Sequence, residues 1–524
     1  MPPCRTCRKT PRGCKYNTSM RITLAHQSIQ SVAADALIVN LFEGVKSPGG
    51  ATGAVDQAIG GAISRMLALG DFRGRLNDVT VIYPAAGVAA PRVLVVGLGP
   101  AAEFTLDHAR QAAGAAARKA RDLGAKRVAT IVHGAGIGGM DPQAAAQATT
   151  EGALLGAYQF REHKANPDAG KKIDELIVVE FDADRLDAVR AGIDAGVIMA
   201  DAINGARRRV NLAPNFLNPV TLADDFAAMA AGVGLRCEVF DENRIHTERM
   251  GAVIGVAQGS HVPPRFVIFE HAPAGHENDS PLIFVGKGVT FDTGGYSIKT
   301  ADGMLTMKGD MAGAAAVAGA MQAIAGLKLP TRVIGITPLV ENMIHGGAMR
   351  PSDVLTSRSG LTIEIANTDA EGRLILADAL DYARQFAPRA VVDIATLTAL
   401  ASSAMGENMA ACVLDNDADL RAALLRASAA AGERIWPMPL WPDYADKIKS
   451  DVAELKNTGG ARGGLGSSAI FLKRFVDGVP GASGYPWAHI DMAGMAFWSE
   501  TRGYSPRGAS GFGVRTMTEL ARAV

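Results

Sequence analysis

Cysteine is scarce in this chain, with five in 524 residues. So few thiols do not make the disulfide framework of a secreted protein, and we expect a reducing, cytoplasmic location. Cys4, Cys7 and Cys14 lie close together near the start, but no following Cys or His completes a zinc finger. We interpret residues 1–20 as a disordered or mis-assigned leader, because its basic residues precede no apolar stretch of a signal peptide.

Net charge is also missing, since 53 basic side chains balance 53 acidic ones. Residues 1–20 hold five basic side chains and no acidic one, so the remaining chain has 48 basic against 53 acidic. This balance argues against nucleic-acid binding as a main role, and an architectural DNA-binding protein stays an alternative that needs a basic stripe. No membrane association is expected, because the best candidate span, 311–327, is short and mostly Ala and Gly.

Several common catalytic motifs are absent, namely the phosphate loop, the Gly-x-Ser-x-Gly elbow and the His-Glu-x-x-His pair. Glycines at 97–102 and 134–139 fit the loose dinucleotide fingerprint, but tight strand-to-helix turns explain them without a cofactor. Binding of a nucleotide-like ligand by the N-terminal region remains a second alternative. His489 follows a strand-like pattern and is interpreted as a buried structural residue.

Strand-like and helical patterns alternate along the chain, which favours α/β sheets covered by helices. At about 100–200 residues per domain, the length predicts more than one domain. We predict two α/β domains, each with a mostly parallel or mixed sheet flanked by helices, and the catalytic site in the second. The predicted divisions are an N-terminal domain at 21–185, a linker helix at 186–213 and a catalytic domain at 214–524.

One informative segment is VGKGVTFDTGGYSIK at 285–299, in which an apolar strand runs into Lys287 and then Asp292. MKGD at 307–310 follows, and it places Asp310 just before the uncharged helical pattern at 311–327. Taken alone, Asp310 is explained as an acid that caps the start of this helix.

The other informative segment is NTDAEGRL at 367–374. Asp369, Glu371 and Arg373 are spaced so that, on an extended backbone continuing the strand expected at 361–366, they point to one side. Arg373 precedes the helix expected at 374–386, where a cation is disfavoured unless an anion lies nearby.

If the two segments converge, their four carboxylates repel one another, and protonation or metal must relieve that repulsion. Two divalent cations would balance the four charges, and oxygen ligands without histidine suit Zn, Mn or Mg. The spacing within each segment leaves the convergence itself open.

The motif at 367–374 resembles the signature of the leucyl aminopeptidase family, the cytosol aminopeptidases with two metals. Blocks at 286–299 and 307–310, DIATLT at 393–398 and WAHID at 487–491 resemble the same family. The resemblance covers about residues 210–520. It implies a metal-dependent aminopeptidase that releases N-terminal amino acids, preferably leucine-like ones, from peptides, and that assembles as a homo-hexamer.

By this resemblance, two divalent metal ions per subunit would be held by Lys287, Asp292, Asp310, Asp369 and Glu371. Asp292 and Glu371 would bridge both metals, and Lys287 would have to be neutral to bind one. Lys299 would polarise the scissile carbonyl, and Arg373 would hold a bicarbonate that acts as a general base. Ala399 and Gly309 depart from the residues common in the family, so the wall of the substrate pocket is expected to differ.

Overall fold

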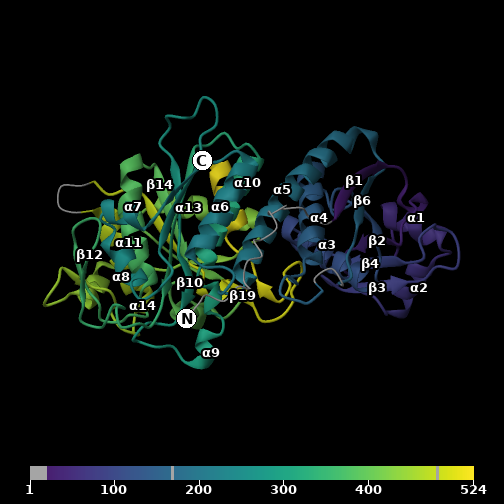
Figure 1. Ribbon diagram of the computed structural model, residues 1–524. Helices are drawn as coiled ribbons and strands as arrows, with labels where there is room; N and C mark the ends of the chain where they lie inside the picture. Colours follow the sequence, from purple (N-terminus) through teal and green to yellow (C-terminus); the bar gives the residue numbers. More distant parts are fainter. Residues whose placement is uncertain (1–19, 167–169, 479–482) are drawn as a thin grey trace, which may run out of the picture.

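The computed structural model describes residues 20–166, 170–478 and 483–524. They form two α/β bodies side by side, with the N-terminal one on the right of Figure 1. The predicted leader with Cys4, Cys7 and Cys14 lies outside the described residues, apart from Met20. None of the helices in these ranges has the length and apolar character needed to cross a membrane.

The N-terminal sheet has six strands in the order β1-β6-β5-β2-β4-β3. Neighbouring strands are parallel, except that the edge strand β3 is antiparallel to β4. The bounds are β1 Arg21–His26, β2 Ala36–Leu41, β3 Val79–Ile82, β4 Val93–Gly97, β5 Arg127–Ile131 and β6 Glu175–Glu180. β2 and β4 are nearly continuous apolar runs because helices cover both faces of the sheet.

Side chains from alternate positions of these strands enter two different cores, one on each face. Leu37 and Val39 pack on one face with α1 (Gly50–Ala58) and α2 (Ala62–Leu69). Ile38 packs on the other face, where α3 (Leu106–Asp122), α4 (Pro142–Ala157) and α5 (Leu186–Asn211) lie. This second core continues into the C-terminal body, so α5 lies between the two sheets, as Figure 1 shows.

The C-terminal sheet has nine strands, eight of them in the order β16-β15-β18-β14-β9-β11-β8-β7, with β10 paired to β11. It is mixed, with a parallel centre formed by β18, β14, β9 and β11. The bounds are β7 Arg236–Phe240, β8 Arg265–His271, β9 Leu282–Gly286, β10 Gly288–Asp292, β11 Val333–Asn342, β14 Ala390–Ala395, β15 Ala411–Asp415, β16 Ile435–Pro437 and β18 Trp487–Asp491.

Helices cover both faces of this sheet as well. The small residues of α10 (Ala312–Gly326) pack closely on β9, β11 and β14, together with α5 and α15 (Val514–Ala523). On the opposite face lie α8 (Gly251–Ala257), α11 (Gly372–Ala383) and α14 (Gly464–Asp477). The remaining helices are α6 (Pro219–Val233), α7 (Glu242–Thr247), α9 (Ala301–Met304), α12 (Ala399–Met405) and α13 (Ala418–Ala431).

The predicted fold class, two α/β bodies with helix-flanked sheets, is confirmed. The long helix predicted before the hinge is α5, but the predicted domain boundaries at 185 and 213 stay a prediction. The strand expected at 361–366 is wrong in length: only Thr362–Glu364 (β13) is a strand, in a small sheet with β12 (Val354–Thr356) and β17 (Leu455–Lys456). β1, β15 and β16 were not predicted.

Candidate active site

A large cavity opens at the carboxyl ends of the central strands of the C-terminal sheet, with a volume of about 1160 Å³. Ligand sites in α/β sheets form at such strand ends, because the loops that follow the strands meet there. All seven residues predicted for the site line this cavity: Lys287, Asp292, Lys299, Asp310, Asp369, Glu371 and Arg373. The structure therefore brings together segments that the sequence left far apart.

Lys287 lies at the break between β9 and β10 and is 3% exposed. Its Nζ is 2.8 Å from Asp310 Oδ2 and 2.9 Å from Glu371 Oε1, and it donates to Thr396 O at 3.0 Å. Gly372 makes room for this side chain, since a Cβ there would lie 2.4 Å from Lys287 Cε. A Cβ at position 372 would therefore force the lysine side chain that crosses it to move.

Asp292 ends β10 and is held from both sides. Its Oδ1 accepts from Gly294 N and from Asn342 Nδ2, each at 2.8 Å. Its Oδ2 lies 2.8 Å from Lys299 Nζ. The backbone turns back after Asp292 through Gly294, which has a φ of +85° that favours glycine.

Asp310 does not cap a helix, although its position before α10 suggested that interpretation. The residue at the helix start is Met311, and no side chain caps its free amides. Asp310 Oδ1 instead accepts from Thr396 Oγ1 at 2.8 Å, while Oδ2 faces Lys287. The side chain thus turns away from the helix and into the cavity.

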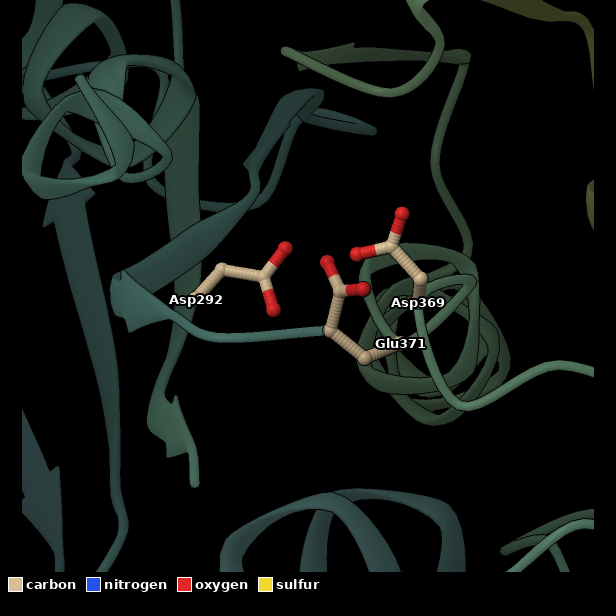
Figure 2. Close-up of side chains that lie close together, drawn as sticks. All are labelled: Asp292, Asp369 and Glu371. Atoms are coloured by element: carbon tan, nitrogen blue, oxygen red, sulfur yellow. The ribbon is translucent and has the colours of Figure 1, made fainter. Parts of the chain in front are cut away.

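Asp369 and Glu371 point toward Asp292 across the cavity, as Figure 2 shows. One carboxylate oxygen from each of the three residues lies within 4.8 Å of the others. The condition of an extended backbone at 369–373 is not met: the chain turns after residue 367, and Glu371 is already helical (φ −75°, ψ −36°) where α11 begins. A turn and a helix start, rather than strand alternation, bring these carboxylates together.

Arg373 lies in the first turn of α11 and is 7% exposed. One Nη donates to Asn457 O at 2.9 Å, while Nε is buried without a hydrogen-bond partner among the described residues. Burial lowers the pKa of this guanidinium to about 10. A buried cation with an unused donor at the positive end of a helix is suited to an anion.

The four carboxylates of the cluster repel one another in a buried site. Burial and the charge of Glu371 raise the pKa of Asp292 to about 6, and burial raises the pKa of Asp310 well above its usual range. Burial alone would lower the pKa of Lys287, but the charges of Asp310 and Glu371 outweigh it and raise that pKa. The protein itself therefore supplies too little positive charge for this cluster.

Glu371 has the carboxylate oxygen best suited to bind a cation. Its Oε2 is buried and accepts no hydrogen bond from the described part of the chain. Leaving a buried charged oxygen unpaired is costly, and carboxylate oxygens are ligands for divalent metals. The residues present thus fit the metal pair that the resemblance implies, although the ligand roles themselves stay a prediction.

Four residues that support the site were not identified as such from the sequence: Asn342, Thr396, Asn457 and Gly372. Asn342 holds Asp292, and Thr396 holds Asp310. Asn457 accepts from the amides of residues 366 and 367 and donates to Asn367 O at 2.7 Å, which fixes the turn that carries Asp369. Of these four, only Asn342 and Thr396 could have been recognised in the sequence, because they stand at or just after the end of an apolar strand.

His489 is buried and lies apart from the cavity lining, as its strand-like setting favoured. Its Nδ1 lies 2.5 Å from Oδ1 of Asp393 on the neighbouring strand. Gly309 and Ala399 both line the cavity, as expected of a changed pocket wall. A Cβ at Gly309 would lie 1.9 Å from Phe497 Cε2, so the ring of Phe497 occupies the place of a larger side chain.

Comparison with known proteins identifies the class of protein. The family model "Cytosol aminopeptidase family, catalytic domain" matches residues 204–518, and that family's N-terminal domain matches residues 38–167. A probable cytosol aminopeptidase from Geobacter sulfurreducens is 42% identical over 470 residues, which are 90% of this chain and 92% of that one. Another from Roseiflexus castenholzii is 38% identical over 506 residues, 96% and 99% of the two chains.

Solved structures agree with this class. The bottromycin maturation enzyme BotP in complex with Mn superposes with a TM-score of 0.82 at 34% identity and covers 94% of this chain and 99% of its own. A variant of tomato leucine aminopeptidase superposes with a TM-score of 0.86 at 28% identity, over 96% and 97% of the two chains. The fold and cavity are those of a peptidase, a hydrolase of peptide bonds. The chain belongs to the cytosol aminopeptidase family.

Proposed function

We propose that this aminopeptidase uses two divalent metal ions, Zn or Mn and less favourably Mg, and prefers leucine-like N-terminal residues. The observation that carries the proposal is the cluster of Asp292, Asp369 and Glu371 within 4.8 Å, with Glu371 Oε2 left unpaired in a buried site. A solved relative, BotP, contains Mn, which supports manganese as one candidate.

The ligands would be Asp292 and Glu371, shared by both ions, with Asp310, Asp369 and Lys287 completing the two sites. Such ions supply a water acidified to near-neutral pKa and a Lewis acid for the carbonyl oxygen. Lys287 must be neutral to contribute a lone pair. Since its acidic neighbours raise its pKa here, only added positive charge beside it can favour the neutral amine.

Lys299 has the position and charge for stabilising the transition state. Burial alone would lower the pKa of its ammonium, but Asp292 and Glu371 outweigh burial and raise that pKa, so the group stays charged. Its Nζ lies 2.8 Å from Asp292 and 2.5 Å from Asp369, at the centre of the cluster. A fixed cation there would polarise the scissile carbonyl and stabilise the oxyanion.

Arg373 would hold a bicarbonate, whose chemistry is that of a general base. Its buried Nε without a partner supports this role. The cavity wall offers apolar contacts for the substrate's first side chain, from Met307, Leu397, Leu400 and Phe497. This lining supports a preference for a bulky apolar residue.

The test is hydrolysis of leucine p-nitroanilide by Glu371→Gln and Asp369→Ala, with folding checked by circular dichroism. Both variants should lose activity almost completely while they stay folded. Glu364→Gln is the matched control, because Glu364 lies outside the cavity lining and bonds to Ser450. A folded Glu371→Gln with full activity would exclude the proposal.

Lys299→Ala separates the two roles within the cluster. It should lower turnover much more than metal content, and unchanged turnover would count against its role. We also propose, from the family resemblance, a homo-hexamer in the cytoplasm. Light scattering on the purified protein should give six times the chain mass of 54.5 kDa, and a monomer would refute the assembly.

A further inference from the structure

The N-terminal body has a second cavity that the peptidase chemistry does not use, with a volume of about 490 Å³. It lies at the carboxyl ends of β2, β5 and β6, three neighbouring parallel strands. Its volume falls within the roughly 300–1000 Å³ usual for small-molecule sites, and its place at these strand ends is where α/β sheets bind ligands. α1, at its rim, lies on the side away from the catalytic body in Figure 1.

Two glycine-containing segments form part of the cavity lining. The loop after β5 contributes residues 134–138, and the start of α1 contributes residues 49–52. α1 has nine residues and a glycine N-cap, and no side chain caps its free amides. Amide groups at a helix N-terminus bind anions such as phosphate.

Gly136 is informative because neither conformation nor packing requires a glycine there. Its φ is outside the left-handed region, and a Cβ would meet no atom within 4 Å. Gly134 and Gly138 differ, since a Cβ at either would lie under 3 Å from Phe104 or from Gly134 O. A glycine that faces open space in a cavity lets a ligand approach the backbone closely.

The end of β6 adds two kinds of contact to one side of the cavity. Glu180 uses Oε1 to accept from the amides of Phe181 and Asp182, at 2.8 and 2.9 Å, which leaves Oε2 for hydroxyl donors. Phe181 is 73% exposed, which is unusual for so large an apolar ring. Arg185 completes this side, held by an ion pair with Asp182 at 3.1 Å and a hydrogen bond to Ala135 O.

We propose that this cavity binds a nucleoside diphosphate: the phosphates at the amides of 134–138 and 49–52, the ribose hydroxyls at Glu180, and the base on Phe181. Arg185 adds a cation near the phosphates. The site is independent of peptide hydrolysis, because none of its lining residues belongs to the catalytic cavity. It gives the N-terminal body a binding function of its own.

The test is isothermal titration calorimetry of the full chain with ADP, and with adenosine and pyrophosphate as separate probes. ADP should bind in the micromolar range, and each half-ligand at least tenfold more weakly. Absence of ADP binding would overturn the proposal, and pyrophosphate binding as tightly as ADP would overturn the nucleoside part of it.

Two variants assign the binding to this cavity. Gly136→Val should weaken ADP binding at least tenfold, because its side chain fills the space, while aminopeptidase activity stays unchanged. Gly232→Val is the matched control, since Gly232 also faces open space but lies in α6, outside this cavity. Equal ADP affinity in the two variants would refute this location, and Phe181→Ser should cost about tenfold if the base stacks there.

Discussion

Asn342 provides a sharp test of how the cluster is held. Its Nδ2 donates to Asp292 Oδ1 at 2.8 Å and to Thr368 O at 3.0 Å, and the residue is 2% exposed. A hydrogen bond to a charged group contributes about 1.5–3 kcal/mol, and a neutral one about 0.5–1.5 kcal/mol. Asn342→Ala should therefore lower the free energy of unfolding by about 2–4 kcal/mol.

The functional consequence should be larger than this stability loss alone implies. Without Asn342, Oδ1 of Asp292 keeps the Gly294 amide and Oδ2 keeps its ion pair with Lys299, so the carboxylate that would bridge both metals is held less firmly. Removing such a supporting contact typically costs about 10–100-fold in metal affinity. The assay is leucine p-nitroanilide hydrolysis as a function of Mn²⁺ concentration, where the half-saturating concentration should rise by about that factor.

Asn416→Ala is the matched control for this experiment. Asn416 also makes two hydrogen bonds, to Tyr485 O at 3.1 Å and from Trp487 N at 2.8 Å, but it lies outside the cavity lining. Asn416→Ala should lower the free energy of unfolding without changing the half-saturating Mn²⁺ concentration. If both variants shift that concentration equally, the claim that Asn342 positions a metal ligand is refuted.

Three further changes have distinct expected outcomes. Gly372→Ala should lower the free energy of unfolding by about 1–3 kcal/mol and remove most of the turnover, because the added Cβ would lie 2.4 Å from Lys287 Cε and overpack the site. A fully active variant would contradict this contact. Arg373→Met should lower kcat with little change in metal content, and added bicarbonate should stimulate the wild type only; stimulation of both would argue against an anion at Arg373. His133 is fully buried, and burial lowers its pKa to about 4. The stability it contributes is complete above about pH 6.5 and falls by about 3 kcal/mol in total as the pH drops from 6.5 to 4, so urea unfolding across this range should show a pH slope that His133→Asn removes.

The sequence predicted the architecture well where hydrophobic patterns are local. The runs at β2, β4, β9 and β14 are buried and apolar apart from Asn40 and Asp393, so their strand type could be read directly. β15 and β16 lie toward one edge of the C-terminal sheet and were not predicted. The expected strand at 361–366 ends at Glu364, and Asn457 holds the chain beyond it by accepting from the amides of residues 366 and 367.

The seven residues named from the sequence line one cavity, but the sequence did not show how the fold brings them together. The sequence left the convergence of Asp369 and Glu371 open, with one shared direction only if the backbone were extended; a turn and the start of α11 bring them together instead. Asp310 looked like a helix cap, and its contacts with Thr396, 86 positions away, and with Lys287 show that its side chain points into the cavity. The packing role of Gly372 carries no signal in the sequence, because Lys287 reaches this first residue of α11 from the distant break between β9 and β10.

The central claim is that a pair of divalent cations lies among these carboxylates, and an anomalous-scattering map tests it most directly. Crystals grown with Mn²⁺ should show two peaks per chain between Asp292, Asp369 and Glu371, with Asp310 and Lys287 at one of them. A map without anomalous density in this cavity, or with one peak outside the cluster, would contradict the account.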